Sequence, residues 1–138
     1  MDEVQVGGRT PALPPRTVRR IIREVLAGEG VDAHVSLTFV GPRVMRRLNH
    51  THKGHDRITD VLAFPLPQPE GGVAGDIYVC RAAALGNARR YGVRPREELV
   101  RLVVHGTLHL LGWDHPEGPG RTLSPMWKLQ ERYVERFA

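Results

Sequence analysis

Residues 104–115 of the chain read VHGTLHLLGWDH, and this stretch decides how the rest of the protein must fold. His105 and His109 stand four residues apart, so both imidazoles project from one stripe if the segment is helical. Apolar residues cover nearly all of the remaining circumference of the helix that we predict over residues 96–111. A helix of this kind must lie at the centre of the protein, because it offers no wide polar face to water.

The three histidines of this stretch form a candidate metal site. Gly112 can end the helix in a left-handed conformation, which turns His115 back toward His105 and His109. Buried imidazoles need partners, because an unpaired polar group in the interior costs about 2–7 kcal/mol. Three neutral imidazoles with a fourth position open are typical of a catalytic zinc site. We therefore predict that these histidines bind one Zn²⁺ in a zincin-like site; core histidines bonded to carbonyl groups are the alternative.

The spacing of the three histidines and Gly112 is that of the metzincin proteases. Those enzymes carry Glu directly after the first histidine, where it acts as the general base. Here that position is Gly106, which can neither accept a proton nor orient a water molecule. Peptide hydrolysis by the usual zincin route is therefore not expected.

The composition is that of an ordinary globular protein. The 138 residues are 41% hydrophobic and 25% charged, which predicts a single domain over residues 1–138. The lone Cys80, together with the lack of a signal segment or a membrane-length apolar run, favours a cytoplasmic protein with no membrane partner. A formal net charge of +5 favours polyanionic partners such as nucleic acid or ribosomes.

The hydrophobic pattern along the chain predicts an α+β fold. Alternating and β-branched runs indicate about four strands, at residues 4–6, 34–40, 60–66 and 75–80. A period of 3.6 residues, with Pro and Gly at the ends, indicates about five helices, at residues 17–28, from 42 through 48, 81–90, 96–111 and 124–137. Most strands come early and the later helices follow as a run, so we expect a small mixed β-sheet packed with helices.

Three ordered motifs of the chain resemble those of the YbeY family, the bacterial rRNA-maturation endoribonucleases. Residues 105–115 match the family's H-G-x-x-H-L-x-G-[YW]-D-H. Leu48-Asn49, Asp56 and the run TDVLAFP at residues 59–65 look like its L-N-x-x-Y-R-x-x-D-x-P-T-D-V-L-S-F-P, and residues 75–77 fall at its G-D-I. The family's Tyr-Arg pair is His52-Lys53 here, its Pro is Ile58 and its Ser is Ala63. The resemblance extends over about residues 4–138.

The resemblance implies a function. It indicates a metal-dependent, single-strand-specific endoribonuclease that acts in maturation of the 3′ end of 16S rRNA and in ribosome quality control. Its partners would be rRNA and the small ribosomal subunit, and no DNA partner is expected. The metal would polarise a phosphoryl oxygen or activate a water molecule. The family's arginine is taken to act in cleavage, so Lys53 is a candidate catalytic residue beside the three histidines, with the same charge but without the bidentate fork.

Two other functions remain open. The first is another zinc-dependent hydrolase, acting on peptides, which would need a carboxylate base from outside the helix. The second is a non-catalytic ribosome-assembly protein in which the metal is structural. RNA cleavage that a chelator abolishes and zinc restores distinguishes the three interpretations.

Several other polar or aromatic residues are candidates for lesser roles. Asp114 would either orient a ligand imidazole or close a turn, and Glu98 would be a supporting residue, a general base or a surface residue. Asp60 and Asp76 are interpreted first as turn or capping groups, and Trp113 first as a packing residue. The spacing of His50, His52 and His55 is typical of a solvated loop that could line an RNA path.

Overall fold

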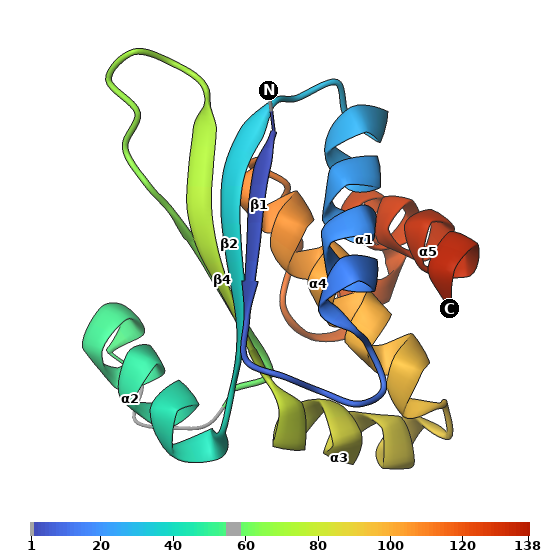
Figure 1. Ribbon diagram of the computed structural model, residues 1–138. Helices are drawn as coiled ribbons and strands as arrows, with labels where there is room; N and C mark the ends of the chain where they lie inside the picture. Colours follow the sequence, from blue (N-terminus) through green and yellow to red (C-terminus); the bar gives the residue numbers. More distant parts are fainter. Residues whose placement is uncertain (1, 55–58) are drawn as a thin grey trace.

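Figure 1 shows the computed structural model of the chain, which describes residues 2–54 and 59–138. The elements in chain order are β1 (Glu3–Gly7), α1 (Pro15–Gly28), β2 (Ala33–Val40), α2 (Pro42–Lys53), β3 (Val61–Pro65), β4 (Val73–Cys80), α3 (Arg81–Tyr91), α4 (Pro95–Leu110), the 3-10 helix η1 (Gly118–Leu123) and α5 (Pro125–Phe137).

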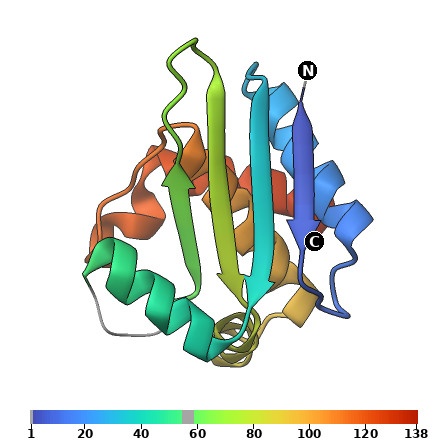
Figure 2. The same cartoon turned by 60° about the vertical axis from the view of Figure 1, so that its left-hand side comes forward.

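The four strands form one mixed sheet in the order β1-β2-β4-β3, as Figure 2 shows. β1 and β4 both run parallel to β2, whereas β3 is antiparallel to β4 and forms an edge of the sheet. The register places Phe64 opposite Asp76 and Ala63 opposite Ile77. Since successive side chains of a strand point to opposite faces, Ala63 and Ile77 share one face while Phe64 and Asp76 share the other.

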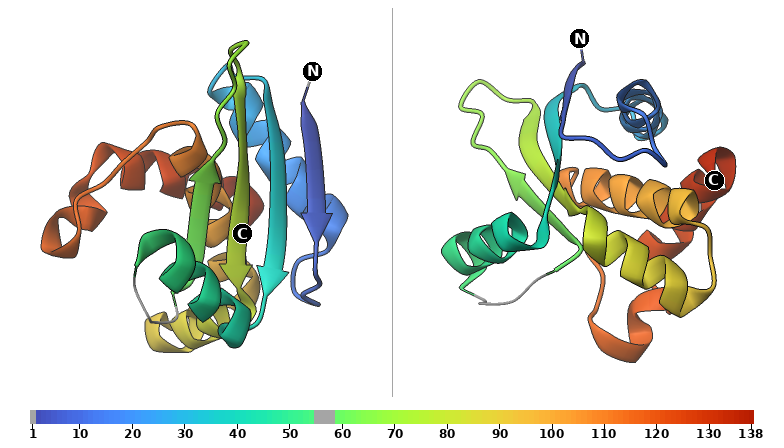
Figure 3. Two further views of the ribbon diagram at one scale, coloured as in Figure 1. Left: turned by 90° about the vertical axis from the view of Figure 1, so that its left-hand side faces the viewer. Right: turned by 60° about the horizontal axis from the view of Figure 1, so that its bottom comes forward.

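Helices cover the two faces of the sheet unequally (Figure 2 and Figure 3). α1, α4 and α5 lie on one side and enclose the larger core, whereas α2 lies on the other side over a small cluster that contains Met45, Leu62 and Cys80. α4 contacts α1, α3, α5, β3 and β4. The prediction of an α+β fold with a four-stranded mixed sheet and five α-helices is thus confirmed for the described residues, and η1 is an addition that the sequence pattern did not predict.

The central helix is buried along almost its whole length. From Glu98 to Leu110 only Arg101 and His109 retain intermediate exposure. Apolar side chains on every side of this helix explain its position, since burial of each one removes apolar surface from water. The prediction that the histidine-bearing helix lies at the centre is confirmed.

A close approach between α4 and the sheet occurs at Gly106. A Cβ atom added at this position would lie 2.7 Å from Cγ2 of Ile77 and 3.3 Å from Cγ2 of Val61. Gly75 on β4 makes a similar approach, since a Cβ there would overlap the Leu110 side chain. The glycine after the first histidine therefore allows α4 to lie close to the sheet, and any side chain at this position would require Ile77 to shift.

Helix α2 continues further than the sequence pattern suggested. His50, His52 and Lys53 lie in its last turn, so the expectation that they belong to a loop is wrong. Gly54 ends the helix with a left-handed backbone (φ 73°), and its N–H donates to the carbonyl of His50. The polar composition of residues 49–53 concealed this turn, because the apolar stripe ends before it. His55, Asp56 and Ile58 lie outside the described residues.

None of the helices in residues 2–54 and 59–138 combines the length and the apolar character that crossing a membrane requires.

We predict that Gly106→Ala lowers the free energy of unfolding by about 1–3 kcal/mol, because the added methyl group overpacks the contact with Ile77. The matched control is Gly86→Ala in α3, where an added Cβ meets no atom within 4 Å. That substitution should raise stability by about 0.5–1 kcal/mol, since alanine favours helix. Urea denaturation of the two variants tests the difference, and equal effects would contradict the close packing at Gly106.

Candidate metal centre

Two elements bring the three histidines together. α4 carries His105 and His109 on one stripe, and Gly112 then adopts φ 95°, a left-handed conformation that glycine tolerates. The Trp113 N–H donates to the carbonyl of Leu108 over 3.1 Å and closes the turn. His115 is thereby directed back toward the helix, as the sequence predicted.

The three imidazole rings converge. The ring centroids are 4.5 Å apart for His105 and His109, 5.1 Å for His105 and His115, and 5.2 Å for His109 and His115. One ring nitrogen of each lies within 4.8 Å of the other two, close enough to hold a metal ion. His105 is buried, whereas the other two are partly exposed, so the group opens toward solvent on one side.

Each imidazole is oriented by an acceptor at its Nδ1 atom. Nδ1 of His105 lies 2.6 Å from Oε1 of Gln130, and Nδ1 of His109 lies 2.9 Å from the carbonyl oxygen of Trp113. Nδ1 of His115 lies 2.9 Å from the carbonyl oxygen of Pro116. Because all three partners accept, each Nδ1 carries the hydrogen and the lone pair resides on Nε2. This is the tautomer of a metal-ligating imidazole whose other nitrogen is held by the protein.

Gln130 is the functional residue that sequence reasoning missed. It lies on α5, is 1% exposed, and its Nε2 donates to Oε2 of Glu131, which fixes the amide with Oε1 toward His105. A signal was available, because Gln130 falls four residues after Met126 and four before Val134, on the buried stripe of this helix. A polar residue on an apolar stripe indicates a partner inside the core.

Burial keeps the two helical imidazoles neutral. Desolvation lowers the pKa of His105 to about 3, although its bond to Gln130 opposes the change. Desolvation also lowers the pKa of His109, and the neighbouring His115 adds to the effect. Metal binding requires neutral imidazole, so neither residue has to release a proton at neutral pH. The donor set, the tautomers and the protonation states together fit a divalent cation that prefers nitrogen ligands.

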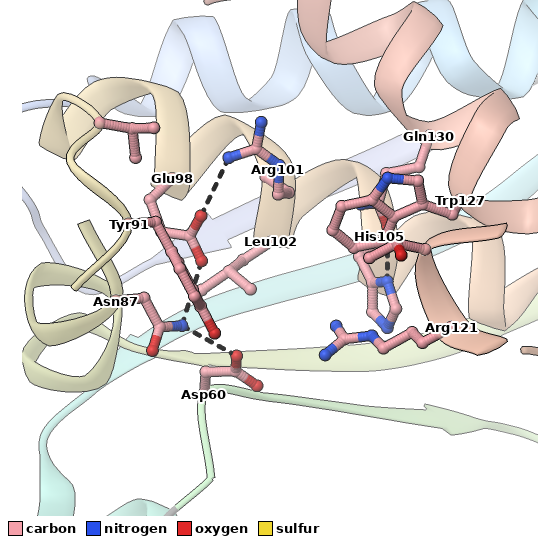
Figure 4. Close-up of a pocket in the computed structure, with 12 residues that line it drawn as sticks. Asp60, Asn87, Tyr91, Glu98, Arg101, Leu102, His105, Arg121, Trp127 and Gln130 are labelled. Atoms are coloured by element: carbon pink, nitrogen blue, oxygen red, sulfur yellow. Dashed lines mark hydrogen bonds and ion pairs between the residues drawn. The ribbon is translucent and has the colours of Figure 1, made fainter. Parts of the chain in front are cut away.

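A pocket of about 330 Å³ opens beside His105 (Figure 4). A chain of hydrogen bonds lines its far end: Asn87 donates to Oδ2 of Asp60 over 3.1 Å and to Oε2 of Glu98 over 3.0 Å. Arg101 then bonds to Glu98, Glu97 and Glu131. Glu98 is 3% exposed, so its interpretation as a surface residue is wrong, and its two partners leave it poorly placed to act as a base.

Lys53 and Asp76 lie away from the histidines. Nζ of Lys53 is 5.2 Å from the ring centroid of Phe64, whose side chain shares with Asp76 the sheet face opposite α4. Asp76 accepts a hydrogen bond from Ser36 over 2.7 Å, across β2 and β4. The structure therefore brings His105, His109 and His115 together but does not bring Lys53 to them.

The remaining candidates have local roles. Oδ1 of Asp114 accepts from the His115 N–H over 2.8 Å, so this residue closes the turn and a backbone carbonyl orients His109. Trp113 packs against the main core and its Nε1 donates to Glu29, which agrees with its interpretation as a packing residue.

Comparison with known proteins identifies similar sequences over most of the chain. The family model described as endoribonuclease YbeY matches residues 10–138. The endoribonuclease YbeY of Thermotoga maritima is 39% identical over 114 residues, which cover 83% of this chain and 74% of the relative. That of Persephonella marina is 30% identical over 138 residues, covering 96% of this chain and 88% of the relative.

The fold has a counterpart among solved structures as well. A solution structure of a protein from Thermotoga maritima matches with a TM-score of 0.67 and 33% sequence identity. The match covers 96% of this chain and 87% of that protein.

We predict that Gln130→Met weakens metal binding about 10–100-fold, because it removes the acceptor that orients His105 while keeping the volume of the side chain. Competition against a chromogenic chelator measures the affinity. Gln68→Met, on the exposed loop between β3 and β4, is the matched control and should bind metal like the parent. An unchanged affinity in Gln130→Met would separate Gln130 from the metal centre.

Proposed function

Since this chain belongs to the endoribonuclease YbeY family, we propose that it cleaves single-stranded RNA by metal-dependent hydrolysis of a phosphodiester bond. The observation that carries the proposal is the convergence of three Nδ1-anchored imidazoles, of which His105 lies at the side of a pocket. His105, His109 and His115 would hold the ion, and we propose Zn²⁺ because a three-histidine set with an open position suits it. A bound divalent cation supplies Lewis-acid stabilisation of the charge that develops on a phosphoryl oxygen.

The protein holds the histidines rigidly and leaves one side of the site open to the substrate. His105 and His109 are fixed by α4, by Gln130 and by the Trp113 carbonyl, so little reorganisation is needed when charge develops in the reaction. His115 lies on the solvent side of the pair, where a phosphate group can approach. The net charge of +5 favours accumulation of a polyanion around the domain.

The general base of the zincin proteases is missing from α4, where Gly106 follows the first histidine. A Cβ atom at position 106 would lie 2.7 Å from Cγ2 of Ile77, so a glutamate there would require the Ile77 side chain to shift. Glu98, the acidic residue of α4 that the sequence put forward, is bonded to Asn87 and Arg101. The alternative of a purely structural metal is disfavoured by the partial exposure of His109 and His115, because structural zinc sites are closed by protein ligands.

The proposed function extends to the RNA substrate and to the process in which the domain acts. We propose that the domain formed by residues 1–138 acts in the cytoplasm on rRNA of the small ribosomal subunit, in maturation of the 3′ end of 16S rRNA and in ribosome quality control. The family supports rRNA maturation, and the positive charge of the chain supports a ribonucleoprotein partner.

We predict that the zinc-loaded protein cleaves a single-stranded RNA faster than the same sequence in a duplex. A flexible strand can bring its phosphate to a recessed ion, whereas a stiff duplex cannot. Gel analysis of end-labelled RNA measures both rates. Chelator treatment should abolish cleavage and zinc should restore it, and His109→Ala should remain at the level of the chelated protein.

Casein serves as the control substrate for this experiment. Casein cleavage that requires His109, with RNA left intact, would replace the proposal by the peptidase alternative. Retained binding to ribosomal particles without cleavage of either substrate would replace it by the assembly-protein alternative.

We predict that Lys53→Ala lowers RNA cleavage less than about tenfold, mainly by weakening RNA binding. Lys53 is exposed on the opposite face of the sheet, so its expected role is long-range attraction of phosphates and not contact with the reacting group. Rates measured over a range of salt concentrations should show a smaller salt slope for this variant, and Lys53→Arg should preserve the parent slope. A variant as active as the parent at every salt concentration would remove Lys53 from the mechanism.

A further inference from the structure

The pocket beside His105 has two ends of different charge (Figure 4). At the histidine end lies Arg121 of η1, and at the opposite end lie Asp60, Asn87 and Glu98. Arg101 also lines the pocket, but its bonds to three glutamates neutralise it, and the bond to Glu131 raises its pKa further. Arg121 is therefore the guanidinium that remains available among the described lining residues.

Arg121 makes no hydrogen bond with its side chain in the described part of the chain. Its Nε atom is buried and has no acceptor, and its guanidinium carbon lies 5.5 Å from the ring centroid of Trp127. Figure 4 shows the side chain extending past the His105 ring into the pocket. A buried guanidinium N–H without an acceptor is costly, so this position favours an anionic ligand. Arg121 and His105 line the same end of the pocket, so the charge of Arg121 lies close to the candidate metal centre.

The other end of the pocket offers acceptors and apolar walls. Asp60 uses one oxygen to accept from Asn87, and a carboxylate has acceptor sites to spare. Leu102, Val93 and the ring of Tyr91 line the pocket, and Tyr91 is 62% exposed. An aromatic ring that is open to solvent beside a recess is suited to stack on a nucleobase. A volume of about 330 Å³ lies at the small end of the range for ligand sites.

We propose that this pocket is the subsite for one nucleotide of the RNA substrate, with Arg121 binding the phosphate that reacts at the histidines and Asp60 accepting from the exocyclic amino group of the adjoining base. The inference rests on the proposed function and deepens it. The charges of the lining residues favour a nucleotide with its phosphate at Arg121, because a phosphate at the opposite end would lie beside the carboxylates of Asp60 and Glu98. Bases with an exocyclic amino group are then preferred over uracil. Arg121 thus supplies a positive charge on the α4 side of the sheet, whereas the charge of Lys53 lies over Phe64 on the other side.

The decisive variants are Arg121→Gln and Arg121→Lys, with Arg132→Gln as the matched control. Arg132 is exposed on α5, lies outside the pocket and changes the net charge equally. Arg121→Gln should lower the cleavage rate of bound RNA about 100-fold, and Arg121→Lys should restore part of it. Arg132→Gln should stay within about twofold of the parent, because it loses only a distant charge.

A second readout measures RNA binding without metal. Fluorescence anisotropy of a labelled single-stranded RNA with the metal-free protein should show about tenfold weaker binding for Arg121→Gln than for Arg132→Gln. Zinc stoichiometry should be one per chain in all variants. Reduced zinc binding in Arg121→Gln alone would show that Arg121 acts by positioning the histidines and would overturn the proposal.

The base preference tests the other end of the pocket. The parent should cleave oligo(A) and oligo(C) faster than oligo(U), and Asp60→Asn should reduce this preference. Equal cleavage of all three by the parent would overturn the assignment of Asp60.

The outcomes separate the subsite from the proposed function. Parent activity on RNA, combined with equal cleavage and binding by Arg121→Gln and Arg132→Gln, would overturn the subsite and leave the proposed function standing. Inactivity of the zinc-loaded parent on every RNA, with binding that still depends on Arg121, would overturn the proposed function and support the subsite as an RNA-binding pocket.

Discussion

The structure depends on the burial of two imidazoles inside an otherwise apolar helix. α4 is held between the sheet and three other helices because its surface is apolar on nearly every side, and this position removes His105 and most of His109 from water. A buried polar group must be bonded, so the rest of the fold has to supply acceptors at defined places. Gln130 comes from the last helix and the Trp113 carbonyl from the turn after α4. The segments after residue 110 therefore supply the acceptors that the buried imidazoles require.

Close packing of the same helix determines which chemistry it can support. At Gly106 the sheet approaches so nearly that even a methyl group meets Ile77. The histidine spacing of a zinc protease is therefore combined with a glycine at the position of the protease's glutamate, where any side chain would displace Ile77. What remains beside the histidines is a guanidinium at Arg121 and a pocket in which Asp60 and Glu98 each accept from Asn87. The positive charge of Arg121, which lines the same pocket as His105, favours an anionic substrate over a neutral peptide bond.

The sequence predicted the parts of the molecule in which one physical pattern dominates. The apolar circumference of residues 96–111 identified the central helix, and Gly112 identified the turn that returns His115. The sequence-based prediction was wrong at positions where a tertiary contact determines the secondary structure or the burial of a residue. Residues 49–53 are helical although they are polar, and Glu98 is buried because Asn87 and Arg101 satisfy it. Lys53 matches a motif position, but the motif does not specify on which face of the sheet a side chain lies.

The distribution of cations over the two faces of the sheet bears on the kind of polymer that fits. Lys53 lies over Phe64 on the α2 side, whereas Arg121 and the histidines lie on the α4 side. β3 is the edge strand between these faces, so a polyanion that contacts both must bend around that edge. A single strand has rotatable backbone bonds and unstacked bases and can follow such a path, whereas a duplex is too stiff over a few nucleotides. The proposed selectivity for single strands would then depend on the sheet edge as well as on the recess that holds the histidines.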